Sequence, residues 1–347
     1  MSVEFQCEIM RAWQPVGRLV SEWSTLWRRC PNATTFQRPE WLWSWIETFR
    51  PARPVIVAVR RDSELVGLAP LLIYSDGNQR VLGLIGGGVS DYLDVLIDAR
   101  FERAISYALW EQVARIPGWD RLWLSDLALG SPLLNAPNEF YDAERQTHDV
   151  CPVLQFPDDV ARDLRAIVPS RQRRNWRNAR ARLLRAGGGH IEVANSHTLA
   201  SMIDEMFQLH HVRWADAGQA GVLSEAVVQE FHRRATKRLL AAGVLRLYGL
   251  RHKRKLVAFL YAFFEDDTVY CYLQAFDPFL KFLSLGTNIL GMVIEDALRL
   301  GKRRVDFLRG REAYKYSWGA KDRPTYSLGA RRASSSIGTA IPADIAA

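Results

Sequence analysis

The segment VDFLRGREAYKYSWGA, Val305–Ala320, decides our prediction of the fold. It opens with the apolar alternation of a β-strand and then places charges of both signs between aromatic rings. A solvated loop needs few rings, and a core strand accepts few charges. We therefore predict that this segment forms the floor of an active site. Its charged and aromatic residues are Asp306, Phe307, Arg309, Arg311, Glu312, Tyr314, Lys315, Tyr316 and Trp318.

The bulk properties indicate a globular protein with more than one domain. At 347 residues the chain exceeds the size of one ordinary core, and 48% apolar with 24% charged residues is a globular composition. The four cysteines lie far apart and the seven histidines are scattered, so we expect reduced thiols and no metal. The start MSVEFQCEIM lacks the pattern of a signal peptide, and the longest apolar run, 256–264, is too short for a membrane span. We expect a soluble, cytoplasmic protein.

The net charge of +8 lies in one block of the chain. Residues 164–190 hold eight arginines and no acid, and 46 minus 8 leaves 38 basic residues against 38 acidic ones elsewhere. On a helix, Arg173, Arg177 and Arg180 share one face. The block is equally compatible with a solvated face and with an anionic partner, either a nucleic acid or a single phosphate.

The order of expected elements is that of an α/β (α+β) protein. The apolar patterns predict strands at 55–60, 64–74, 80–88, 119–127, 151–156, 244–251, 255–264 and 268–276. Helices are predicted at 101–116, 170–186, 198–215, 225–242 and 286–300.

The two halves of the chain share a register. Arg60 and the residues RDSELVGLAPLL that follow it align with Arg251 and HKRKLVAFLYAF at an offset of 191 residues. Farther on, GWDRLWLSDL resembles GKRRVDFLRG, each a glycine-led strand after a helix. Amphipathic hairpins can look alike by chance, but the shared order favours a duplicated domain. We predict domains at 1–160 and 161–332 and a disordered tail at 333–347.

The segment FDPFLKFLSLGTNILGMVIEDALRLG, 276–301, predicts a phosphate-binding helix start. A strand ends at Asp277, a loop follows, and small residues open a long amphipathic helix whose free N–H groups attract anions. Ordinary capping by Ser284 is the competing interpretation. The predicted cradle comprises Ser284, Gly286, Thr287 and Asn288.

Two further segments supply candidate binding residues. LIGGGVSDYLDVLI, 84–97, lacks a phosphate-loop motif and reads as a turn between strands, in which Asp91 and Tyr92 could hold an amine or hydroxyl. LHHVRWADAG, 209–218, places His210, Arg213 and Trp214 on adjoining helix faces, as a structural histidine or as a cleft wall.

Together these segments resemble the CelD-like (BcsL-like) acetyltransferases of the GNAT superfamily of acyl-CoA N-acyltransferases. The resemblance rests on DFLRGREAYKYSWGA, on LHHVRW and on the basic SRQRRNWRNARARL helix, and it is densest from Leu164 to Ala320. It implies two GNAT-like domains, each a mixed, splayed sheet flanked by helices, with acyl-CoA bound where two central strands diverge. The loop FLSLGTN keeps only Gly286 of the superfamily's pyrophosphate motif, since Leu283 and Asn288 replace the flanking consensus residues.

The resemblance implies an acyltransferase that moves an acetyl group from acetyl-CoA to an amine or hydroxyl. Glu312 is our first choice of general base and Asp306 the second, unless Asp306 forms a structural ion pair with Arg309 or Arg311. Tyr314 or Tyr316 would protonate the departing thiolate. Arg309 is assigned to the cofactor, and the substrate side is assigned to His210, Arg213, Trp214, Lys315, Trp318, Asp91 and Tyr92.

Two rival functions stay open. Fem-type tRNA-dependent aminoacyltransferases also carry two such domains, and the arginine block would then bind RNA. A non-catalytic binding protein on a degenerate transferase fold is the other. The family's association with cellulose and capsule pathways suggests a sugar or polysaccharide precursor as the acceptor, and no metal is expected.

Overall fold

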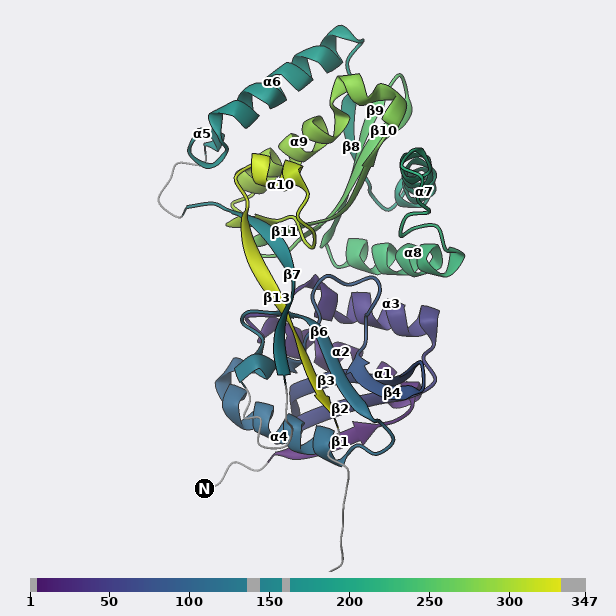
Figure 1. Cartoon of the computed structure of the whole chain (residues 1–347), viewed down its shortest axis with the longest axis vertical. Helices are drawn as coiled ribbons and strands as arrows, with labels where there is room; N and C mark the ends of the chain where they lie inside the picture. The colour runs from purple at the N-terminus through teal and green to yellow at the C-terminus, as the bar shows by residue number, and fades with distance from the viewer. Residues whose placement is uncertain (1–4, 136–143, 158–162, 332–347) are drawn as a thin grey trace, which may run out of the picture.

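The computed structural model describes residues 5–135, 144–157 and 163–331. They form two lobes that share one mixed sheet of 13 strands (Figure 1). The predicted tail at 333–347 lies outside the described residues. Within those residues, no helix combines the length and the apolar character that crossing a membrane requires.

Each predicted strand is present in the sheet. The strands are β1 (Gln6–Met10), β2 (Pro54–Arg61), β3 (Glu64–Asp76), β4 (Gln79–Leu84), β5 (Leu96–Ile97), β6 (Arg121–Ala128), β7 (Glu144–Gln155), β8 (His190–Val193), β9 (Leu245–His252), β10 (Lys255–Phe264), β11 (Thr268–Phe276), β12 (Arg304–Asp306) and β13 (Lys321–Arg331). However, β4 ends four residues earlier than predicted and β7 begins seven residues earlier, and β1, β5, β8 and β13 were not predicted.

The helices include all five that the sequence predicts and several that it does not, chiefly in the first 50 residues. They are α1 (Trp13–Arg18), α2 (Val20–Arg28), α3 (Pro39–Phe49), α4 (Glu102–Arg115), α5 (Leu164–Ile167), α6 (Ser170–Arg185), α7 (Leu199–Asp216), α8 (Ala226–Ala241), α9 (Leu285–Arg299) and α10 (Ala313–Ser317), with short 3₁₀ turns η1 (Thr35–Gln37), η2 (Ala99–Phe101), η3 (Pro132–Asn135) and η4 (Pro278–Leu283).

The two lobes exchange their last strands. The sheet order is β1-β2-β3-β4-β6-β13-β7-β12-β11-β10-β9-β8, with β5 added beside β3. Thus β7 follows β6 in the chain but pairs with β12, and β13 follows β12 but pairs with β6. The two long strands run side by side from one lobe into the other (Figure 1). The domain limits 1–160 and 161–332 remain a prediction, since each lobe is completed by a strand of the other half.

The hairpin register predicted from the sequence reappears as matching geometry. β2–β3 turns through Asp62 and Ser63, and β9–β10 turns through Lys253 and Arg254, again 191 residues apart. All four residues have positive φ, between 48° and 69°, as a type I′ hairpin turn requires. This likeness supports duplication, and with the splayed sheets it gives two GNAT-like lobes.

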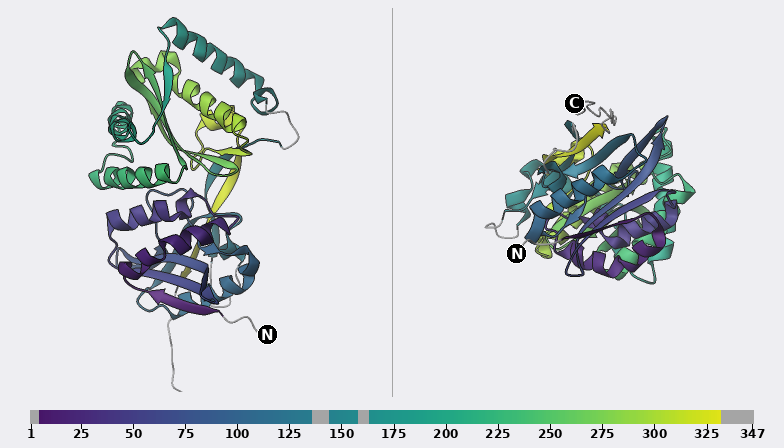
Figure 2. Two further views of the ribbon diagram at one scale, coloured as in Figure 1. Left: turned by 180° about the vertical axis from the view of Figure 1, so that it is seen from behind. Right: turned by 90° about the horizontal axis from the view of Figure 1, so that it is seen from below.

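Helices cover both faces of the sheet in the second lobe. α6 and α9 lie on one face and α7 and α8 on the other, and α3 of the first lobe lies against α8 (Figures 1 and 2). At this junction Trp41 packs fully buried between Phe36, Phe231 and Phe263. Full burial of one such large side chain contributes about 1.5–3 kcal/mol, so the rings hold the lobes together.

Candidate active site

The two central strands of the second lobe pair briefly and then diverge. β11 and β12 run parallel from Thr268 opposite Arg304 to Tyr270 opposite Asp306, and no further residue pair joins them in the described chain. Leu308 and Gly310 have φ of 58° and 108° and turn the chain away from β11. The strand that was predicted to open the segment 305–320 therefore ends at Asp306, and the segment continues into α10. The N–H groups on the open edge of β11 have lost their neighbouring strand.

Two adjacent cavities lie at this opening. The inter-lobe pocket, of about 310 Å³, extends from Val89 and Asp91 of the first lobe to His210 and His232. The α9 pocket, of about 610 Å³, lies at the start of α9. They meet at a junction whose lining both share: Trp214, Gln274, Leu290, Glu312 and Tyr314.

The start of α9 offers backbone donors to the α9 pocket. The first helical hydrogen bond runs from the Asn288 N–H to Ser284 O, so the N–H groups of Leu285, Gly286 and Thr287 precede it. Ser284 stands at the N-cap with φ of 52°, but its side chain makes no capping bond. The competing prediction of ordinary side-chain capping is therefore not what the structure shows.

The basic helix α6 is packed against α9 beside this pocket. A Cβ on Gly291 would lie only 2.3 Å from the Trp176 ring, so the close approach of the two helices depends on this glycine. Arg182 Nη2 donates to Ser284 Oγ at 2.7 Å. α6 therefore brings positive charge to the mouth of the α9 pocket.

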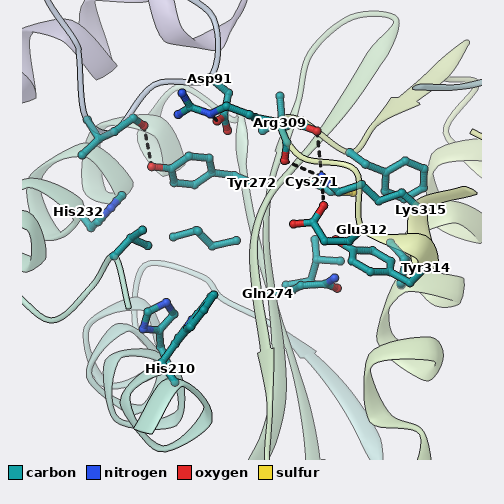
Figure 3. Close-up of a pocket in the computed structure, with 18 of the residues that line it drawn as sticks. Asp91, His210, His232, Cys271, Tyr272, Gln274, Arg309, Glu312, Tyr314 and Lys315 are labelled. Atoms are coloured by element: carbon teal, nitrogen blue, oxygen red, sulfur yellow. Dashed lines mark hydrogen bonds and ion pairs between the residues drawn. The ribbon is translucent and has the colours of Figure 1, made fainter. Parts of the chain in front are cut away.

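Glu312 lies at the junction on a segment that Lys315 holds. Glu312 is 57% exposed and pairs with Lys315 Nζ at 2.9 Å, whereas the Lys315 side chain is 3% exposed. Lys315 Nζ also donates to the carbonyl oxygens of Leu308, Arg309 and Gly310. Figure 3 shows Lys315 beside Glu312 and Arg309. Lys315 thus fixes the turn, and Glu312 remains accessible from both pockets. Burial raises the pKa of Tyr314 beside it, so this hydroxyl keeps its proton at neutral pH.

The opposite wall of the inter-lobe pocket comes from α7 and α8 and carries two histidines (Figure 3). Burial lowers the pKa of His210 to about 4 and that of His232 to about 3, so both are neutral at pH 7. His232 Nδ1 is buried and has no hydrogen-bond partner in the described structure. The sequence analysis missed His232 and Gln274. His232 interrupts the apolar face of α8, and Gln274 interrupts the apolar strand β11. These interruptions were the signals that the sequence offered.

Asp91 and Arg309 connect the two lobes at the edge of the inter-lobe pocket. Arg309 Nε lies 3.1 Å from Asp91 Oδ1 and its Nη1 lies 3.2 Å from Asp126 Oδ1. Burial raises the pKa of Asp91 to about 6 although Arg309 opposes the shift. Arg309 therefore lies beside the inter-lobe pocket, on the far side of the junction from α9.

The structure brings most of the predicted site residues to these cavities. His210, Lys315, Arg309 and Asp91 line the inter-lobe pocket, Trp214, Glu312 and Tyr314 line both, and the α9 pocket is lined by Ser284, Gly286, Thr287, Arg213 and Trp318.

Four predicted residues lie elsewhere. Asp306 is buried, accepts from the Tyr92 hydroxyl at 2.8 Å and lines a separate cavity with it; burial raises its pKa to about 6. Its expected partners, Arg309 and Arg311, pair instead with other aspartates. Tyr316 donates to Asp322 and lines neither cavity. Asn288 is buried and donates to the carbonyls of Leu283 and Ser284, so it holds the loop.

Gly310→Ala is expected to lower turnover about tenfold or more by moving Glu312 rather than removing it. Gly310 has φ of 108°, and a Cβ there would lie 2.7 and 2.9 Å from the Glu312 carboxylate oxygens. The backbone strain costs about 1–3 kcal/mol and the carboxylate must leave the junction. The measurement is the turnover rate of the enzyme together with its melting temperature. Gly118→Ala is the matched control, since Gly118 has φ of 88° with nothing within 4 Å. Equal turnover in both variants would remove the link between Gly310 and Glu312.

A splayed mixed sheet with an uncapped helix start beside the opening is the arrangement that the resemblance to the GNAT superfamily predicts. Residues 170–316 match the family of the acetyltransferase (GNAT) domain. The segment that matches covers most of the second lobe, and the fold of the whole chain is that of two GNAT-like domains.

Solved structures share this fold over nearly the whole chain. FemX has a TM-score of 0.65 at 12% identity, covering 92% of this chain and 96% of its own. The C-terminal domain of a putative lysylphosphatidylglycerol synthetase from Agrobacterium fabrum gives 0.56 at 12%, covering 90% and 91%. A tandem GNAT protein from the clavulanic acid pathway gives 0.51 at 16%, covering 96% and 100%. No curated protein matches the sequence. At these identities the likeness establishes the fold.

Proposed function

We propose that this protein is an acyl-CoA-dependent acyltransferase that moves an acetyl group from acetyl-CoA to an amine or hydroxyl. The observation that carries the proposal is the divergence of β11 and β12 beside the uncapped start of α9. This arrangement supports the proposal because an opening for a thioester would lie next to backbone donors for phosphates, in two cavities that share lining residues. The resemblance to CelD-like enzymes favours a sugar or polysaccharide precursor as the acceptor.

The residues of the α9 pocket fit a CoA donor. The phosphates of CoA would accept hydrogen bonds from the N–H groups of Leu285, Gly286 and Thr287. Ser284 and Lys281 line the same end of the pocket. Arg182, bonded to Ser284, adds positive charge from a second helix. The donor would supply the thioester, and the residues of the α9 pocket would orient the donor.

The groups for proton transfer lie at the junction. Glu312 is placed to take the proton of the acceptor, directly or through water, and Tyr314 to donate one to the departing thiolate. N–H groups on the open edge of β11 are the donors for the developing oxyanion. The acceptor would enter the inter-lobe pocket, where neutral His232 offers it a hydrogen-bonding group.

Acetyl-CoA is expected to raise the melting temperature of the purified protein. A ligand at about 100 times its Kd stabilises by roughly 2.7 kcal/mol, which moves the midpoint of a chain of this length by roughly 4 °C. Free CoA should shift it as well, and ATP should not. Absence of any shift with acetyl-CoA and CoA at millimolar concentration contradicts the proposal.

One observation favours a second candidate, aminoacyl transfer from tRNA. Six arginines of α6 are exposed, and the helix lies beside the α9 pocket: Arg171, Arg174, Arg177, Arg180, Arg182 and Arg185. A phosphate backbone bound there would show an affinity that falls steeply with salt. Salt-sensitive tRNA binding together with no acetyl-CoA shift selects this candidate over the first.

A further inference from the structure

The first lobe closes its own opening with a loop of its own chain. β4 and β6 run parallel only at Val81 opposite Arg121 and Leu82 opposite Leu122 and then separate, as β11 and β12 do. The chain that follows β4 returns to β6, where the Leu93 N–H donates to Asp126 O at 3.1 Å. The position where the two strands separate is thus a cavity in the second lobe, whereas in the first lobe the loop after β4 fills it.

This loop is held rigidly by the helices of the first lobe. Trp41 Nε1 donates to Ser90 Oγ at 2.9 Å, and Gln37 Nε2 donates to Tyr92 O at 2.9 Å. Trp45 Nε1 donates to Gly87 O at 3.2 Å. All three donors belong to buried side chains, so the loop between them has a fixed position.

The tip of the loop, Val89–Tyr92, contacts both arms of the second lobe's opening; we call it the clamp. On the β11 arm, the Tyr272 hydroxyl donates to Val89 O at 2.7 Å (Figure 3). On the other arm, the Tyr92 hydroxyl donates to Asp306 Oδ2 at 2.8 Å, and Arg309 bonds to Asp91 and to Ser90 O. Through Val89, Ser90 and Asp91 the clamp therefore bridges the two arms beyond their last pair, and through Tyr92 it contacts that last pair itself.

We propose that the clamp sets the width of the opening and so positions the acyl end of the donor, which gives the first lobe a role in the reaction without a ligand of its own. Beyond Tyr270 the arms lack the hydrogen bonds of a ladder, and the clamp attaches there to Tyr272 and to Arg309, with a third attachment at Asp306, the last paired residue. Glu312 follows Arg309 by three residues, so the clamp also fixes the position of the base. This inference rests on the proposed function.

The affinity for the nucleotide end of the donor serves as a reference within the same experiment, because the clamp should not affect it. The α9 pocket that would hold it is lined by α6, α7, β11, α9 and the 312–318 segment, and the clamp is absent from its lining. Loosening the clamp should therefore weaken contacts to the acetyl group and leave contacts to CoA unchanged. If the clamp had a purely structural role, its loosening would change the affinities for acetyl-CoA and for free CoA by the same factor, or change neither.

The experiment measures the Kd of acetyl-CoA and of free CoA by calorimetry for the wild type, Tyr92→Phe, Asp91→Asn and the double variant. We expect the double variant to lose about tenfold in acetyl-CoA affinity, since hydrogen bonds to charged groups are removed, with CoA affinity within about twofold. Tyr248→Phe is the matched control: its hydroxyl donates to Asp296 at 2.8 Å on the far side of the sheet. It should change neither Kd.

The outcomes separate this inference from the proposed function. If the wild type binds neither ligand, the acyltransferase proposal fails and the inference falls with it. If the wild type binds both and the variants keep the wild-type ratio of the two Kd values, the clamp has no positioning role although the proposed function stands. Should the double variant not fold, Tyr272→Phe tests the β11 attachment alone by the same ratio.

Discussion

Glu312→Gln is expected to lower turnover with an amine acceptor by about 10²–10⁴-fold, the usual contribution of a general base. Glu312 lies where the two cavities meet, and an amide of the same shape cannot take a proton. Its side chain is 57% exposed, so the melting temperature should barely change, and Lys315 retains its three carbonyl acceptors. The measurement is release of CoA from acetyl-CoA in the presence of the acceptor.

The acetyl-CoA affinity of Glu312→Gln should equal that of the wild type, which locates the defect in the chemical step. Glu230→Gln is the control, because it also removes an exposed ion pair, to Arg234 on α8. Turnover within about twofold of the wild type would falsify the assignment of Glu312 as base. Asp91, the other carboxylate lining the inter-lobe pocket, would then be the residue to replace.

The sequence predicts the two hairpins and the five long helices of this fold because their signals are local, but not β13 or the helices of the first 50 residues. The β2–β3 and β9–β10 hairpins are encoded in alternating apolar residues around two-residue turns, so their shared register is visible without a structure. The strand exchange is not local. β7 pairs with β12 and β13 through residues about 150 to 190 positions away, and nothing in either strand's own pattern specifies those partners.

The site was partly predictable for the same reason. Glu312, Tyr314 and Lys315 stand in one short segment, where charges among rings mark a functional surface. Asp306 belongs to that segment too, but its role depends on Tyr92, which lies 214 residues earlier and in the other lobe. His232 is one histidine on an apolar helix face, a pattern that more often indicates a structural residue. Only the fold shows that it faces a cavity.

Lys315→Met is expected to lower the free energy of unfolding by about 3–5 kcal/mol and to lower turnover at least about 100-fold. The Lys315 ammonium is nearly fully buried and bonds to three carbonyl oxygens and to Glu312. Methionine fills a similar volume but donates no hydrogen bond, so the carbonyls of Leu308, Arg309 and Gly310 lose this partner. Two of these three residues have positive φ, and the turn that carries Glu312 loses the bonds that offset its strain.

Lys302→Met is the matched control for this change, measured by urea unfolding and by turnover. Lys302 also donates to carbonyls, those of Glu265 and Asp266, but it is half-buried and lines neither cavity. Its replacement should lower the free energy of unfolding by about 1 kcal/mol and leave turnover unchanged. If Lys315→Met is no less stable than Lys302→Met, Lys315 does not hold the turn. If it is unstable yet fully active, the turn is not what positions Glu312.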